Sequence, residues 1–259
     1  DPQQWQSLVD SSPYATWFQM PEAYRFYAAV KDEMTPFAFG IERDGELRAV
    51  VVGYVTKEKS ALKQFFTRRA IVIGGPLIGE HATESDVEQL LRVTASELKS
   101  QAIYIETRNF HDYSRWKTVF EANGFTYQAH LNFHVDTSSV EVVDKNLGKS
   151  RKRDIRTTIR DGVTPVLNPT IEQVREYYAI LKDLYITKVK TPLFSWNFFE
   201  QLYHTAHGRF ILTEYQGKII GGTVCVVLPN RAVYEWFVCG VDGVYEHIFP
   251  SSYATYLGI

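Results

Sequence analysis

Two stretches of the chain have runs rich in β-forming apolar residues on either side of a glycine turn, and each stretch predicts a β-hairpin. Residues 37–55 read FAFGIERDGELRAVVVGYV, with the turn at Asp44-Gly45. Residues 209–228 read RFILTEYQGKIIGGTVCVVL, with Gly217 at the turn. Glycine supplies the positive φ angle that tight hairpin turns need. Two antiparallel hairpins are therefore expected.

The remaining pattern mixes helical periods with short apolar runs. Val87, Leu90, Leu91 and Leu98 recur at helical spacing, which predicts a helix over residues 84–101. Gly124 and Gly208 are expected to close two other helices. The full set comprises helices at 11–34, 84–101, 112–124, 145–160, 171–189, 195–208 and from 250, and further strands at 70–79, 102–107, 125–137, 163–168 and 232–241. The strand at 102–107 is expected to be buried. Alternating helices and strands that include two hairpins indicate an α/β fold with mixed, largely antiparallel sheets.

The two hairpins belong to a repeated unit. Each follows an aromatic helix and is followed by another strand and then a helical pattern. We expect a first domain over residues 1–137, a basic helix and strand joining the domains over 138–168, and a second domain over 169–259. A second copy of equal length would run past Ile259, so this domain is expected to be incomplete.

Composition narrows the class of protein. The 259 residues are 45% hydrophobic and carry a net charge of −2, so any anion site must be local. Cys225 and Cys239 lie in apolar runs that resemble core strands, and two free thiols in a reduced cytoplasm are favoured over a disulfide. No apolar run approaches the roughly 20 residues of a membrane span. The chain is therefore expected to be cytoplasmic and to have no stable membrane insertion.

The stretch KNLGKSRKRDIRTTIRDGV, residues 145–163, concentrates positive charge. On a helical wheel its cations share one stripe while Ile155 and Ile159 face the core. Guanidinium groups in a row suit phosphate, because each can contact two oxygens. The alternative is a solvated helix whose cations pair with nearby carboxylates. The expected stripe consists of Lys145, Lys149, Arg153, Arg156 and Arg160.

Several stretches, taken in order, resemble a known family. They are ATWFQMPEAY, AIVIGGPLI, IYIETRN, ANGFTYQAHLNFHVD, KSRKRDIRTTIRDGV and AVYEWFVCG. This order resembles the FemAB family of peptidoglycan-bridge aminoacyltransferases, which have two GNAT-like (Gcn5-related N-acetyltransferase) domains in tandem. The chain departs from the family pattern at Tyr24, where tryptophan is usual, and in lacking a lysine one turn later.

The resemblance implies a function. It predicts transfer of an aminoacyl group to an amine of a UDP- or lipid-linked cell-envelope precursor, whose phosphate lies against the basic helix between the domains. The donor would be charged tRNA, and no cofactor is expected. Arg153 and Arg156 are the first candidates for phosphate binding, followed by Lys149 and Arg160.

Other candidate residues lie at strand ends and on one later strand. Glu106 and Arg108 lie where the strand at 102–107 ends and are the catalytic candidates, although a buried structural ion pair explains them equally well. Tyr234 and Trp236 alternate on one side of their strand, and the resemblance places that strand beside the aminoacyl site. Core packing is the alternative for both aromatics, and Tyr215 is a weaker candidate.

Two further activities stay open. An acyl-CoA- or acyl-carrier-dependent N-acyltransferase would act on a sugar, amino acid or lipid, although no glycine-rich pyrophosphate loop is evident. A nucleic-acid-binding module would use the basic helix alone. His130 and His134 would share one face of the strand at 125–137, but without a third ligand no metal site is expected.

Overall fold

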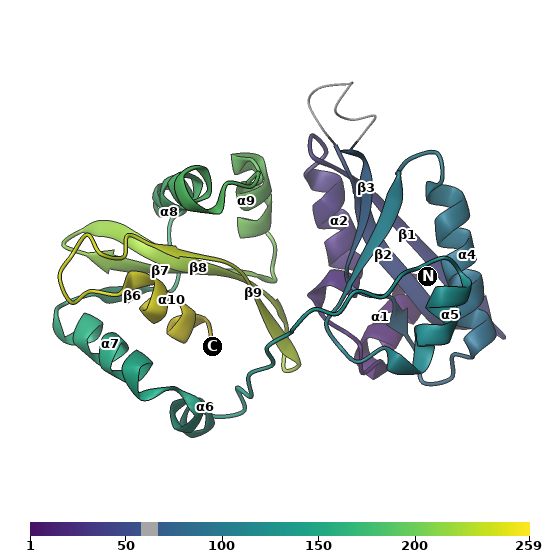
Figure 1. The fold of residues 1–259 in the computed structure, drawn as a ribbon, viewed down its shortest axis with the longest axis horizontal. Helices are drawn as coiled ribbons and strands as arrows, with labels where there is room; N and C mark the ends of the chain where they lie inside the picture. Colours follow the sequence, from purple (N-terminus) through teal and green to yellow (C-terminus); the bar gives the residue numbers. More distant parts are fainter. Residues whose placement is uncertain (58–66) are drawn as a thin grey trace. The chain divides into compact units, whose positions relative to one another are not determined.

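A computed structural model describes residues 1–57 and 67–259 of the chain. These residues form two compact units, Asp1–Asn132 and Phe133–Ile259 (Figure 1). None of the helices within the described ranges has the length and apolar character that a membrane crossing needs.

The first unit contains a mixed sheet between helices. Its strands follow the order β1-β2-β3-β5, with β4 paired to β2, and only β3 and β5 run parallel. The helices α2 and α4 lie on opposite sides of this sheet (Figure 1). The elements are α1 (Pro2–Ser11), η1 (Trp17–Gln19), α2 (Pro21–Ala29), β1 (Met34–Arg43), β2 (Glu46–Thr56), β3 (Arg69–Gly74), β4 (Leu77–Ile78), α4 (Glu84–Leu98), β5 (Tyr104–Asn109), η2 (Ser114–Trp116) and α5 (Lys117–Ala122).

Hydrophobic side chains pack against both faces of the first sheet. Leu90 and Leu98 of α4 pack with Val51 and Val72 on one face. On the other face, the rings of Tyr27 in α2 and Tyr54 in β2 lie 4.8 Å apart. Burial of such apolar surface is the main favourable term in folding.

The second unit repeats the layered plan. Its sheet follows the order β6-β7-β8-β9 and is antiparallel throughout. The helices α8 and α9 lie on one side, and α7 and α10 lie on the other (Figure 1). The elements are α6 (Val140–Asn146), α7 (Lys149–Arg160), β6 (Thr164–Val166), α8 (Ile171–Leu184), η3 (Tyr185–Val189), α9 (Trp196–Tyr203), β7 (Gly208–Tyr215), β8 (Lys218–Leu228), β9 (Ala232–Gly240) and α10 (Pro250–Gly258).

The expected repeat is visible in the backbone of the two hairpins. Asp44 and Gly45 have φ angles of 53° and 75°, and Gln216 and Gly217 have 52° and 74°. Each hairpin also shifts register at the same distance before its turn, at Ile41 in β1 and at Thr213 in β7. Because the two hairpins share both the turn conformation and the position of the register shift, they have the same local construction.

Two expected helices differ from the structure at their ends. The helix predicted over 145–160 is interrupted at Leu147-Gly148, so Lys145 belongs to α6 and the stripe loses it. The helix predicted to close at Gly208 ends at Tyr203, and Gly208 begins β7 instead. The sequence reading also missed α1, which Asp1 caps and Pro2 begins.

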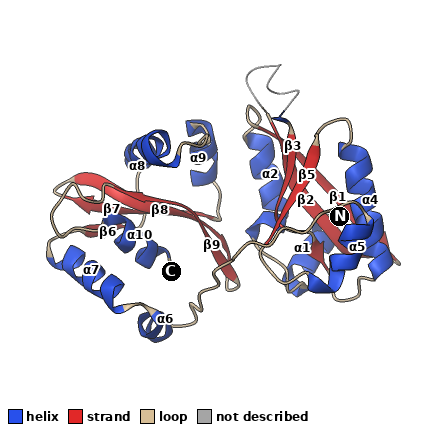
Figure 2. Cartoon of the chain, viewed as in Figure 1, coloured by secondary structure: helices blue, strands red, loops and turns tan. Residues whose placement is uncertain are grey.

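The strand predicted over 125–137 is wrong, and with it the shared strand face of His130 and His134. These residues form no strand and appear as loop in Figure 2. Leu131 and Phe133 are 88% and 89% exposed. Alternation makes a segment compatible with a sheet, but a strand also needs a partner for its backbone groups, and no described strand pairs with it.

The strand β5 exists but is not buried as expected. Its first residue, Tyr104, is 47% exposed, because β5 is the outermost strand of the described sheet. Its free edge therefore lacks the neighbour that would bury its side chains.

Candidate anion-binding site

The basic sequence folds as a helix because its apolar and small side chains meet the second unit's core. Ile155 is 5% exposed, and Asp154 and Thr158 are buried beside it. The Thr158 hydroxyl accepts a hydrogen bond from the Phe249 amide at 3.0 Å. Arg151 donates to the Ser252 hydroxyl in α10 at 3.0 Å. These contacts fix which face of α7 stays outside.

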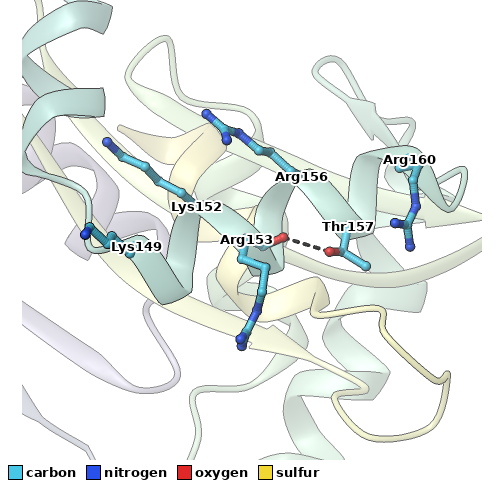
Figure 3. Close-up of a pocket in the computed structure, with 6 residues that line it drawn as sticks. All are labelled: Lys149, Lys152, Arg153, Arg156, Thr157 and Arg160. Atoms are coloured by element: carbon cyan, nitrogen blue, oxygen red, sulfur yellow. Dashed lines mark hydrogen bonds between the residues drawn. The ribbon is translucent and has the colours of Figure 1, made fainter.

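The outer face of α7 forms an open cavity of about 350 Å³ whose lining comes entirely from this helix. Four of the lining residues were expected from the sequence, while Lys152 and Thr157 were not. Lys145 was expected in the stripe but lies in α6, and Lys152 lines the cavity instead. The lining consists of Lys149, Lys152, Arg153, Arg156, Thr157 and Arg160 (Figure 3).

Two of these cations are engaged by neighbouring carboxylates. Arg153 donates to Asp154 at 3.1 and 3.3 Å, and Arg160 donates to Asp161 at 2.7 and 3.2 Å. The hydrogen bond with Asp161 raises the pKa of Arg160. The same bond lowers the pKa of the Asp161 carboxyl. These two arginines are thus partly neutralised.

The other three cations have no such partner. Lys149, Lys152 and Arg156 make no hydrogen bond or ion pair with any residue in the described ranges. In Figure 3, Lys152 and Arg156 extend to one side of the helix, while Arg153 and Arg160 point to the other. Two of the three unpaired cations therefore lie together on one side of the stripe, and Lys149 lies at the start of the helix.

The start of α7 adds to this positive field. The first turn contains no acidic residue, and the cap residue Gly148 has no side chain to accept the free amides. A helix N-terminus carries partial positive charge, so lysine at this place is unfavourable unless an anion binds. The arrangement can therefore hold an anion with several oxygens, such as a phosphate or diphosphate.

The catalytic candidates of the first unit form an ion-pair cluster. Glu106 accepts a hydrogen bond from Arg108 at 2.6 Å and lies 3.5 Å from Arg69. Burial raises the pKa of nearby Tyr54 to about 12, against the lowering effect of Arg108 and Arg69, so it stays a neutral phenol. Glu106 and Arg108 do form an ion pair, but their side chains are 31% and 48% exposed, so the pair is not the buried one that the structural alternative requires. Their catalytic role stays a prediction.

The aromatic candidates of β9 lie on one side of the strand, with the rings of Tyr234 and Trp236 6.5 Å apart. Trp236 also contacts Phe198 of α9 at 5.1 Å between centroids. Trp236 therefore contributes to the core on that face. Tyr215 packs against Tyr245 at 5.1 Å. Their contact with a substrate stays a prediction.

Both cysteines are free and buried, as expected. Burial raises the pKa of Cys225 from an ordinary 9.0 to about 11 and that of Cys239 to about 12. A rise of two units lowers the thiolate fraction at neutral pH roughly 100-fold, and only the thiolate attacks. Neither residue is therefore suited to be a nucleophile.

We expect a thiol reagent such as iodoacetamide to modify neither Cys225 nor Cys239 at pH 7 in the folded protein, since both thiols are protonated and enclosed. Mass spectrometry after a timed reaction checks this, and the same protein in guanidinium chloride is the control. Rapid labelling of either residue before unfolding would contradict the buried, protonated state.

Comparison with known proteins shows that solved structures share the fold of this chain. No protein-family model and no curated protein sequence matches the chain. A crystal structure of FemX matches 99% of this chain and 83% of its own, with a TM-score of 0.70 and 10% identity. The C-terminal domain (DUF2156) of a putative lysylphosphatidylglycerol synthetase from Agrobacterium fabrum matches 99% of this chain and 72% of its own, with a TM-score of 0.50 and 10% identity. The chain therefore has the fold of FemX over nearly its whole length, as the resemblance to the FemAB family predicts.

Proposed function

We propose that the protein is an acyltransferase that moves an aminoacyl or acyl group to an amine of a phosphate-bearing cell-envelope precursor. The observation that carries this proposal is the stripe of unpaired cations on α7. The fold supports it, because FemX has the same fold and another matched structure is named as a domain of a putative lysylphosphatidylglycerol synthetase. In this proposal α7 binds the phosphate of the precursor.

Within the site, Arg156, Lys149 and Lys152 bind the phosphate first. Among the residues that the structure describes, their side chains have no partner to give up, so a charge-assisted bond to the ligand replaces no internal one. Arg153 and Arg160 must first leave Asp154 and Asp161, which reduces their net contribution. A UDP-linked precursor supplies the two adjacent phosphates that such a group of cations fits.

The chemistry needs positioning more than covalent help. The donor ester or thioester is already activated, so an amine held against its carbonyl carbon can react without an enzyme nucleophile. The protonated, buried thiols of Cys225 and Cys239 agree with this route. The proposed donor is charged tRNA, and acyl-CoA is the alternative.

A transfer assay tests the proposal. The protein is incubated with a UDP-linked muropeptide or its lipid-linked form, together with bulk tRNA charged with labelled amino acids, or with labelled acetyl-CoA. Label that survives mild alkali in the precursor shows an amide and supports an aminoacyltransferase. Label from acetyl-CoA alone supports the alternative donor. No label from either donor contradicts the proposed function.

A further inference from the structure

A carboxylate partway along β9, the outermost strand of the second sheet as described, lies where structural need does not explain it. Glu235 is an exposed residue of β9 and lies opposite Cys225 of β8. The register of the two strands shifts beside this pair, so Trp236 is an extra residue on β9. This bulge turns Trp236 toward α9 and leaves Glu235 on the opposite face.

The carboxylate is held in place by a buried hydroxyl. Thr223 is fully buried, and its hydroxyl donates to Glu235 Oε1 at 2.9 Å. The Phe237 carbonyl is a second acceptor for the same hydroxyl, at 3.3 Å. Thr223 would therefore be satisfied without Glu235, and the carboxylate is not needed to pair a buried donor.

Within the described ranges of the chain, no cation neutralises this carboxylate. Among the residues that the structure describes, no lysine, arginine or histidine forms an ion pair with Glu235. Gly258 of α10 lies against this group: a Cβ there would be tight against Thr223 Cγ2 at 3.0 Å and in ordinary contact with Glu235 Oε1 at 3.7 Å. The surroundings thus fix one oxygen and leave the negative charge uncompensated.

From this geometry we infer that Glu235 binds the acceptor as its ammonium ion and takes the proton that the amine must lose. The inference rests on the proposed acyl transfer and assigns a catalytic residue to it. An oriented carboxylate with a free oxygen has the chemistry of a general base. Thr223 is a positioning residue, because it acts only through Glu235.

In the proposed transfer Glu235 acts first as a base and then as an acid. The ammonium gives one proton to Glu235, and the neutral nitrogen attacks the carbonyl carbon of the donor. The carbon–nitrogen bond forms, and the bond from carbon to the ester oxygen or thioester sulfur breaks. Glu235 returns its proton to that departing atom, and the second nitrogen proton goes to water. The products are an amide and an alcohol or thiol.

Substitutions separate this role from a structural one. Glu235→Gln is expected to lower kcat about 100-fold or more, as loss of a general base does. Binding of the UDP-linked muropeptide is expected to weaken only about fivefold or less, because an exposed ion pair contributes little and the phosphates still meet the cations of α7. Thr223→Val keeps the shape of the buried side chain and is expected to lower kcat less. Added formate should restore part of the activity of Glu235→Ala, which a merely structural residue would not allow. Glu172, an exposed carboxylate of α8, supplies the matched control Glu172→Gln.

The outcomes distinguish this inference from the proposed function. Wild-type transfer with an equally active Glu235→Gln overturns the role of Glu235 and leaves the transferase standing. A second measurement needs no transfer: titration with propylammonium chloride is followed at the carboxyl carbon of Glu235 by NMR. A saturable change absent with equal sodium chloride supports ammonium binding, and an identical response to both salts overturns it.

Discussion

Replacing Arg156 with glutamine is expected to weaken binding of a UDP-linked muropeptide roughly 10- to 150-fold, which corresponds to the loss of one charge-assisted hydrogen bond of about 1.5–3 kcal/mol. The effect is large because Arg156 has no partner within the described residues and lines the cavity on α7. Isothermal titration calorimetry at low ionic strength measures the change, since added salt screens exposed charges.

The same helix offers a matched control. Arg151 also lies on α7, but it contacts Asp154 and Ser252 and does not line the cavity. Arg151→Gln is therefore expected to leave the affinity within about twofold of the wild type, since exposed pairs away from the ligand contribute little. Equal losses in Arg151→Gln and Arg156→Gln would show a diffuse charge effect and contradict a built site.

Truncation of Phe198 to alanine is expected to reduce the free energy of unfolding by about 3–5 kcal/mol. This side chain is fully buried at the centre of an aromatic cluster between α9 and β9. Its ring stacks on Phe194 at 4.2 Å and meets Trp236 and Phe237 edge-on at 5.1 and 5.8 Å. Removal of the ring leaves a cavity that such a cluster cannot close. Urea unfolding followed by circular dichroism measures the loss.

A surface phenylalanine provides the comparison for this substitution. Phe133 is 89% exposed, so Phe133→Ala is expected to change the free energy of unfolding by less than about 0.5 kcal/mol. If Phe198→Ala proves as mild as Phe133→Ala, the aromatic cluster does not hold α9 on the sheet. Trp236 would then be available for a role outside the core.

Local signals predicted much of the fold. The glycine turns at Asp44-Gly45 and Gly217 set both hairpins, because turn chemistry depends on a few adjacent residues. The helical spacing of Arg153, Arg156 and Arg160 likewise predicted the cavity lining, since three- and four-residue spacing places side chains on one face.

Features that depend on distant partners were not predictable. Residues 125–137 alternate like a strand, yet pairing requires a neighbour that the segment itself does not encode. The bond from Thr223 to Glu235 depends on the register and bulge of β8 and β9, which no local pattern reveals. A glycine within a helical pattern does not by itself show whether the helix breaks there, so the break at Gly148 was not predictable. Because of this break Lys145 lies outside α7, and Lys152 lines the cavity instead.

In the proposed function, the outer face of α7 binds the phosphates of the substrate. Mapping a UDP-linked muropeptide onto the backbone amides by NMR tests it most directly. We expect saturable shifts centred on residues 149–160, lost in Arg156→Gln and retained in Arg151→Gln. Saturable shifts confined to other parts of the chain, with the amides of α7 unmoved, would contradict the claim.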